Sequence, residues 1–464
     1  MRKRFLLLPF ALLIGLFNLP AQTTPVKDVK PETPAPKTPL FGISFSGYVK
    51  TDILFDSRQT VGLRDGQFLL YPDAVKLDAE GNDINAKASY NFVSIQTRLA
   101  GTITGPDAIG AKTSGYIEGE FFGNSNAAIN SFRLRHAWVK LNWKTTELMV
   151  GQWWHPMFVP DCAPATVSFN TGAPFVVFSR NPQIKLTQAF GKFKMALTFL
   201  SQVDFMSDGP DGASTKYIRN SVIPESDLQI WYQAKNEAKG TEFMVGAGIN
   251  FQILTPRISS TVITKAAYDT VINSKVEHHD AVTASYKTNA TTSSMAYNLY
   301  AKLKLKHATI KMGGEYGGDN NAYMMLGGYV VKSVTDPVKG LVDYANIRSY
   351  ALWAECHTNG QRWQPGLFLG FAKNLGAGET VLASTTLISS TPLVVTGPYY
   401  ARGSNIDYIY RVSPRLVFNA GKVRLAGEVE YTAAAYGKTN EKGYVYNASE
   451  VANVRLLLGV YYFF

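Results

Sequence analysis

Apolar and polar residues alternate with a period of two along the C-terminal end of the chain. In residues 453–464, one face is apolar at every second position and the other carries Arg455, Leu457 and Gly459. The apolar positions are Val454, Leu456, Leu458, Val460, Tyr462 and Phe464. The segment 422–436 repeats the pattern, with Arg424 and Glu428 on its polar face. Such alternation predicts β-strands that separate an apolar from a polar environment.

The same pattern recurs along most of the chain in segments of about ten residues. It predicts strands at 41–56, 91–105, 112–123, 130–143, 146–154, 182–190, 192–205, 227–234, 242–254, 293–306, 309–316, 347–357, 366–374, 407–419, 422–436 and 449–464. A further segment, 281–286, alternates more weakly. Counting it would give seventeen strands, and single-chain bacterial barrels close with an even number, so we assign it to a loop and predict sixteen strands, with eighteen as the alternative.

The connections between these segments alternate in length. Short connections follow the even-numbered strands, at 106–111, 144–145, 191, 235–241, 307–308, 358–365 and 420–421. Longer ones follow the odd-numbered strands, at 57–90, 124–129, 155–181, 206–226, 255–292, 317–346, 375–406 and 437–448. Short periplasmic turns that alternate with longer outer loops are typical of outer-membrane barrels. The sequence therefore predicts an all-β fold, a transmembrane antiparallel β-barrel of about sixteen strands.

The charged residues decide which face of each strand points inward. Lys302, Lys304 and Lys306 alternate with apolar residues, and a lysine that faces lipid near the midplane costs about 2–4 kcal/mol. The lysines must therefore face a water-filled lumen. Applied to every strand, this rule gives the candidate pore-lining residues Lys50, Arg98, Glu118, Glu120, Arg133, Arg135, Lys302, Lys304, Arg411 and Arg424.

Three arginines on neighbouring strands suggest how the lumen treats ions. Arg98, Arg133 and Arg135 face the same interior as Glu118 and Glu120. The five side chains could simply pair across the wall, at little net energy. Because guanidinium groups outnumber carboxylates here, the sequence also predicts a modest preference for anions, which a charged pore lining can impose.

The pattern of the N-terminal residues indicates a targeting segment followed by a spacer segment. Residues 1–21 combine a basic start with a short apolar run and are expected to be a cleaved secretory signal peptide. Residues 22–39 contain five prolines and are expected to form an extended periplasmic segment. The barrel is assigned to residues 40–464. Removal of the signal lowers the formal charge from +11 to +8, and export argues against nucleic acid as the partner.

The chain ends in aromatic residues. Tyr462 and Phe464 occupy the third-last and last positions of an alternating strand. This ending resembles the C-terminal signal by which the outer-membrane assembly machinery recognises its substrates. An ordinary aromatic girdle at the membrane interface is the alternative interpretation.

The first third of the chain resembles the DcaP-like porins of the trimeric sixteen-strand superfamily. The residues that carry the likeness are Gly47–Ile53, Gly115–Gly123, Phe132–Trp138, Val150–Trp154 and Asn181–Lys185. The resemblance implies a homotrimer in outer-membrane lipid that conducts small anionic solutes, dicarboxylates among them. Members often carry an N-terminal periplasmic coiled coil, whereas this chain has a proline-rich segment in that place.

Motifs for enzyme chemistry are weak, and we assign no catalytic residue, metal or cofactor. Glu277–Asp280 contains two histidines but lacks the spacing of a metal-binding helix. Cys356 and His357 are consecutive on a strand and point to opposite faces, so they cannot form a dyad. Gly246 and Gly248 lack the third glycine of a dinucleotide site. An outer-membrane hydrolase is the least favoured function.

The sequence is compatible with two functions. The first is a porin for passive diffusion of small hydrophilic, preferentially anionic solutes. The second is a non-transport barrel that serves as a surface-exposed binding or adhesion scaffold. Loop 155–181 bears on the choice, because it is rich in proline and phenylalanine. It is expected either to fold into the lumen or to form an outer lid.

Deletion of Phe464 should hinder insertion, because the terminal strand must pair with segment 41–56 to close the barrel. The measurement is the amount of heat-modifiable protein in the outer-membrane fraction, compared with the full chain. Normal amounts of the truncated protein would contradict the interpretation of the terminus as an assembly signal.

Overall fold

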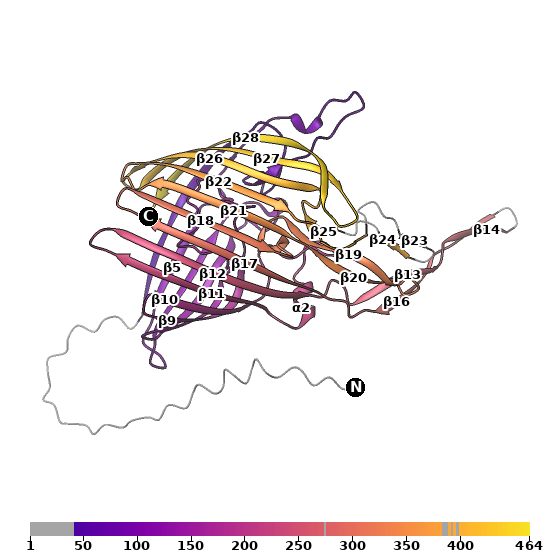
Figure 1. Ribbon diagram of the computed structural model, residues 1–464, viewed down its shortest axis with the longest axis horizontal. Coiled ribbons are helices and arrows are strands. Elements are labelled where there is room, and N and C mark those ends of the chain that lie inside the picture. Colours follow the sequence, from indigo (N-terminus) through magenta and orange to yellow (C-terminus); the bar gives the residue numbers. More distant parts are fainter. Residues whose placement is uncertain (1–40, 273–274, 383–387, 391–392, 396–398) are drawn as a thin grey trace, which may run out of the picture. The chain divides into compact units, whose positions relative to one another are not determined.

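The computed structural model describes residues 41–464 except 273–274, 383–387, 391–392 and 396–398. The expected signal peptide and proline-rich segment, residues 1–39, lie outside the described residues. Figure 1 shows one barrel whose tilted strands end in short turns on one side and in long loops on the other. No helix in the described part is long and apolar enough to span a membrane.

Sixteen antiparallel strands form the barrel wall. In chain order they are β1 (Gly42–Asp56), β4 with β5 (Ser89–Val93 and Arg98–Thr104), β6 (Lys112–Glu120), β7 (Arg133–Asn142), β8 (Thr146–Trp154), β9 (Arg180–Phe190), β10 (Phe193–Leu200), β11 (Glu225–Asn236), β12 (Thr241–Leu254), β17 (Thr292–Lys304), β18 (Ala308–Gly317), β21 (Ser349–Thr358), β22 (Trp363–Asn374), β26 (Ile406–Ala420), β27 (Val423–Thr439) and β28 (Val445–Phe463). β4 and β5 form one wall strand because both pair with β1. Each predicted wall strand overlaps one of these, so the predicted fold class is confirmed.

The barrel closes where its first strand meets its last. β1 pairs antiparallel with β28, from Tyr48 opposite Phe463 to Asp56 opposite Arg455. The other side of β1 pairs with β4 and β5. Each wall strand thus has a hydrogen-bonded neighbour on both sides, as lipid requires of a spanning sheet.

The long connections carry further secondary structure. It comprises β2 (Thr60–Leu63), β3 (Phe68–Pro72), η1 (Ile84–Ala86), η2 (Asn126–Ala128), α2 (Lys216–Ser221), β13 (Ser259–Lys265), β14 (Tyr268–Ile272), β15 (Lys275–His279), β16 (Val282–Lys287), η3 (Asn321–Tyr323), β19 (Gly327–Asp336), β20 (Leu341–Ile347), β23 (Ile388–Ser390), β24 (Leu393–Val395) and β25 (Tyr399–Arg402). The segment 281–286, assigned to a loop from sequence, corresponds to β16. It pairs with β13 in a hairpin outside the wall.

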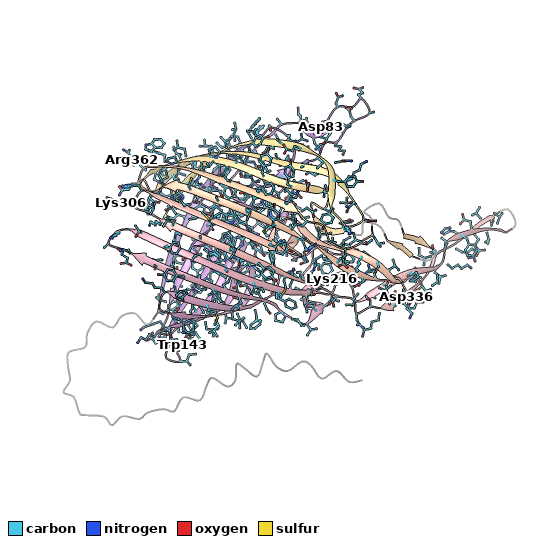
Figure 2. All side chains as sticks on the ribbon, in the orientation of Figure 1. Asp83, Trp143, Lys216, Lys306, Asp336 and Arg362 are labelled. Carbon is cyan, nitrogen blue, oxygen red and sulfur yellow. The ribbon has the colours of Figure 1, made fainter. Side chains whose placement is uncertain are left out.

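The two ends of the barrel differ in the length of their connections. Figure 2 labels Trp143, Lys306 and Arg362 in short connections at the turn end. Asp83 and Lys216 lie in long connections at the loop end. Short turns face the periplasm in outer-membrane barrels, so the loop end is the outer end.

The outward face of the wall is apolar and bears aromatic rings near both ends. Tyr297 and Tyr316 stack toward the loop end, with ring centroids 6.3 Å apart. Trp363 and Phe418 meet at the turn end, at 4.5 Å. Between them, leucines such as Leu299 and Leu352 are more than half exposed on the outside of the barrel. This arrangement matches an apolar band between two aromatic girdles.

Three loops fold into the loop end of the barrel and pack together. They are loop 1 (residues 57–88), loop 3 (155–179) and loop 6 (318–348). Phe68 of loop 1 meets Phe178 of loop 3 at 4.9 Å, and the Phe178 N–H donates to Tyr323 O of loop 6 at 3.0 Å. The sequence predicted a water-filled interior, but this part of the lumen is a packed apolar core, because the loops bring in their own aromatic residues.

Glycines on the inner wall make room for this packing. Gly370 of β22 lies under the ring of Phe175 from loop 3. A Cβ at Gly370 would come within 2.4 Å of Phe175 Cδ2, far inside van der Waals contact. Gly313 lies in the same way under Trp353, a wall residue. The missing side chains therefore let aromatic rings lie flat against the wall.

Gly370→Ala should displace Phe175 and destabilise the barrel by about 1–3 kcal/mol, the usual cost of overpacking a core. Urea unfolding of the protein in lipid vesicles measures the change. Gly427→Ala on β27 is the matched control, because a Cβ there meets nothing closer than 4.0 Å. Equal stability of the two variants would contradict close packing of loop 3 on β22.

Candidate functional site in the barrel lumen

A cluster of arginines and glutamates lies where β5, β6 and β7 face the lumen. Arg98 of β5 and Arg133 of β7 lie opposite Glu120 of β6 in the strand register. Glu120 Oε2 accepts from Arg98 Nε at 3.1 Å, and Glu120 Oε1 accepts from Arg133 Nη2 at 2.8 Å. Arg135 donates to Glu120 Oε2 at 2.9 Å and to Glu118 Oε1 at 2.5 Å. All five predicted residues are therefore brought together.

Arg180 and Asp204 complete this arginine cluster, and strand alternation also places Asp204 on the lumen face. Arg180, the first residue of β9, lies 2.7 Å from Asp204 Oδ2 in the loop between β10 and β11. Arg133 reaches the same carboxylate at 3.3 Å. Arg180 also lies over the ring of Trp154, 5.0 Å from its centroid. The sequence placed Arg180 in a loop, where strand alternation assigns no face.

Burial makes the pairing inside the arginine cluster necessary. Glu120 is fully buried, and Arg135 is only 2% exposed. Charges removed from water lose several kcal/mol of solvation each, which only close opposite charges and hydrogen bonds offset. Four guanidinium groups share the carboxylates of Glu118, Glu120 and Asp204, which leaves one positive charge in excess. These distances show that the residues pair across the wall, which was one of the two interpretations of the sequence.

Two other predicted lining residues anchor loops. Lys50 is fully buried, pairs with Asp52 at 3.0 Å, and donates to Val167 O of loop 3 at 3.1 Å. Arg411 is 1% exposed and donates to Ala173 O of loop 3 at 2.9 Å and to Leu70 O of loop 1 at 2.8 Å. Both side chains face the lumen, but loops cover them. The sequence could not predict these contacts, because the acceptors are backbone carbonyl groups, which every residue has.

Loop 3 crosses the lumen. On one side, Cys162 Sγ donates to Ala301 O of β17 at 3.2 Å. On the other, the N–H groups of Val167 and Ser168 donate to Glu428 Oε2 of β27 at 2.5 and 2.8 Å. Of the two placements expected for loop 155–181, the structure shows the one inside the lumen.

The remaining predicted lining residues, Lys302, Lys304 and Arg424, lie toward the turn end. Lys302 pairs with Glu242 at 2.7 Å and is partly exposed. Lys304 is exposed, and Arg424 is half-buried with its Nε bonded to Asn419. A cavity of about 100 Å³ beneath loop 3 is lined in part by Arg415, Arg424, His357 and Tyr461.

The two residues of the expected assembly signal lie on the outside of the wall. Tyr462 pairs with Val49 of β1 and is half exposed. Phe464 is also half exposed, and its N–H donates to Gly47 O at 3.2 Å. They thus combine barrel closure with an apolar outward face.

The weak chemical motifs are dispersed in the structure. His278 lies in the outer hairpin, with Nδ1 2.5 Å from Asp269, and no group of three or more potential metal ligands occurs among the described residues. Glu355 and His357 bond to each other on the lumen face at 2.7 Å, whereas Cys356 faces outward. Burial raises the pKa of the Cys162 thiol to about 11, which keeps it protonated.

Comparison with solved structures shows which fold this is. DcaP, an outer membrane channel of Acinetobacter baumannii, aligns with 91% of this chain and 97% of its own, at 14% identity and a TM-score of 0.59. The chain has a DcaP-like porin fold. An anion-selective porin from Comamonas acidovorans aligns over 91% of this chain and 100% of its own, at 13% identity and a TM-score of 0.48. No protein-family model and no curated protein matches the chain.

The porin fold and the apolar exterior together give the location. A closed barrel with an apolar outward band is stable only where lipid covers that band. The chain is therefore a protein of the cell outer membrane.

Glu120→Gln should destabilise the porin fold by about 3–5 kcal/mol, because the four guanidinium groups within 4 Å of Glu120 would lose a buried counter-charge. Glu147→Gln is the control, since Glu147 forms a partly exposed pair with Lys140 at 3.2 Å and such pairs contribute about 0–1 kcal/mol. Urea unfolding in vesicles compares the two variants. A loss below 1 kcal/mol for Glu120→Gln would show that the arginine cluster does not brace the wall.

Proposed function

We propose that this chain is a porin through which small hydrophilic solutes, preferentially anions, diffuse passively across the outer membrane. The DcaP-like fold supports a channel, and the resemblance in the first third of the chain adds dicarboxylates as candidate solutes. In this proposal the protein is not an enzyme. No cofactor takes part, and selectivity comes from pore width and lining charge.

The observation that carries the anion preference is the excess of basic groups between loop 3 and the turns. The basic side chains on this part of the lumen face are Arg98, Lys140, Lys185, Lys194, Lys302, Lys304, Lys311, Arg415 and Arg424. The acidic ones are Glu118, Glu120, Glu147, Glu242, Glu355 and Glu428, and Asp161 of loop 3 borders the same space, so basic groups still outnumber acidic ones. A cleft lined by one sign of charge raises the local concentration of ions of opposite sign.

Pairing removes some of these charges but leaves others free to act on solutes. Glu242 is paired with Lys302, and Glu355 with Arg415. Lys304 is exposed near the turns without such a partner among the described residues. The net positive field at this end of the pore therefore favours anions modestly, and salt weakens it.

We also propose that the porin is a homotrimer in outer-membrane lipid and that the outer-membrane assembly machinery recognises Tyr462 and Phe464. The trimer follows from the resemblance to the trimeric superfamily. The exposed aromatic residues at the end of β28 support the recognition of the terminus.

A surface-exposed binding or adhesion scaffold is the second candidate function. Two features favour it: loops 1, 3 and 6 pack inside the barrel, and strands β13–β16 form a long hairpin that projects beyond the loop end (Figure 1). Single-channel recording in planar bilayers separates the two functions. A folded protein that inserts but never conducts would favour the scaffold.

Removing two basic groups from the pore lining should shift the selectivity. The double variant Lys304→Gln with Arg424→Gln should move the reversal potential in a KCl gradient toward that of a cation channel. The shift should be larger at 0.1 M salt than at 1 M, because the screening length falls from about 10 Å to about 3 Å.

The matched control removes two exposed lysines from the outer hairpin, Lys265→Gln with Lys275→Gln. It should leave the reversal potential unchanged. A folded lining variant that retains the original reversal potential would contradict the proposed role of the turn-end charges.

A further inference from the structure

A cavity of about 250 Å³ lies between loop 3 and the inner wall. Residues of β8, β9, β10, β11, β12 and β17 line its wall side, and Pro156, Phe158 and Pro160 line its loop side. None of the ten predicted lining residues contributes to it. The cavity is therefore a separate feature of the lumen.

Aromatic rings form much of the cavity lining. Trp231 of β11 and Trp154 of β8 border it from the wall, and Phe158 lies 4.2 Å from Trp154. Trp231 is half-buried, so part of its surface is free to contact a solute. Tyr300 lies on Gly246 beside Trp231, which holds the ring flat against the wall.

Two lysines share this cavity with the rings. Lys194 of β10 lies opposite Trp231 in the strand register, so the two side chains are direct cross-strand neighbours. Lys185 of β9 also lines the cavity. The acidic residue that lines the cavity is Asp161 of loop 3. It is exposed, and its carboxylate accepts a hydrogen bond from Gln233 Nε2 at 3.5 Å.

The two lysines differ in their pairing from Lys140 and Lys302. Lys140 and Lys302 have carboxylate partners at 3.2 and 2.7 Å. Neither Lys185 nor Lys194 has a carboxylate within 4 Å among the residues that the structure describes. Two cations thus border an aromatic cavity without a close counter-charge from the protein.

We propose that this cavity is a binding subsite for small aromatic carboxylates that pass through the pore. The inference rests on the proposed porin function and names a class of solute for it. The aromatic ring of the solute packs against Trp231, and its carboxylate lies between Lys194 and Lys185. A cavity of about 150 Å³ holds a benzene ring, so the space here suits one ring with a carboxylate.

The aromatic character of the solute follows from the lining. Offset stacking on an indole requires a flat π-face, which an aliphatic acid lacks. A lysine beside the indole supplies a compact positive charge for a single carboxylate. Benzoate fits both requirements, cyclohexanecarboxylate keeps the charge but not the flat ring, and acetate has the charge alone.

The test is block of the chloride current through single channels by these three anions. Benzoate should reduce the current at lower concentration than cyclohexanecarboxylate, and acetate should act least. Trp231→Leu removes the ring without changing charge, so it should raise the half-blocking concentration of benzoate about threefold to tenfold, the range of an aromatic contact. It should leave the chloride-to-potassium selectivity unchanged.

Lys194→Gln provides the second variant, and it decides the test if Trp231→Leu fails to fold. It should weaken block by benzoate by at least the same factor. Lys304→Gln removes the same charge outside the cavity and should change the half-blocking concentration less than Lys194→Gln does.

Benzoate and cyclohexanecarboxylate that block equally, or block that is unchanged in Trp231→Leu and Lys194→Gln, would overturn the subsite while leaving the porin intact. A folded protein that carries no chloride current at all contradicts the porin function itself. The two failures are therefore distinguishable in one recording.

Discussion

Inside a bilayer, every backbone N–H and C=O must find its partner within the protein, and this requirement governs the whole structure. A sheet can satisfy it only by closing, which it does here through β1 and β28. Successive side chains of a strand point to opposite faces, and closure turns one of these faces toward lipid and the other toward the interior. The apolar exterior, the charged lumen and the covering of buried charges by loops all follow from it.

The charged interior in turn depends on what fills the barrel. Near the turns, basic side chains such as Lys304 are exposed, and in the proposed function they act on solutes. Near the loops, the same kind of side chain is cut off from water and must bind carboxylates or backbone carbonyls, as Arg135 and Arg411 do. One alternation pattern therefore yields two environments. Loop 3 forms the boundary between them.

The sequence predicted all sixteen wall strands because strand alternation is local: each residue's face can be read from its neighbours. It also predicted that five charged residues face the same part of the interior, since they lie on adjacent strands: Arg98, Arg133, Arg135, Glu118 and Glu120. It did not predict that loops would bury Lys50 and Arg411, because their partners are backbone carbonyls of distant loops, which any residue can provide. Strand alternation also places Lys185 and Lys194 on the lumen face, but it did not predict the cavity that they share with Trp231, because that cavity requires the path of loop 3 to be known.

The anchoring of loop 3 has a consequence for the order of folding events. Its carbonyl at Val167 is held by Lys50 on the first strand, and its adjacent amides by Glu428 on the penultimate one. These anchors stand at opposite ends of the chain and become neighbours only when the ends of the sheet meet. Complete docking of loop 3 on both anchors therefore requires a closed seam. With the seam open, loop 3 could keep its contacts with Arg411 and Ala301 but could not reach Lys50 and Glu428 at the same time.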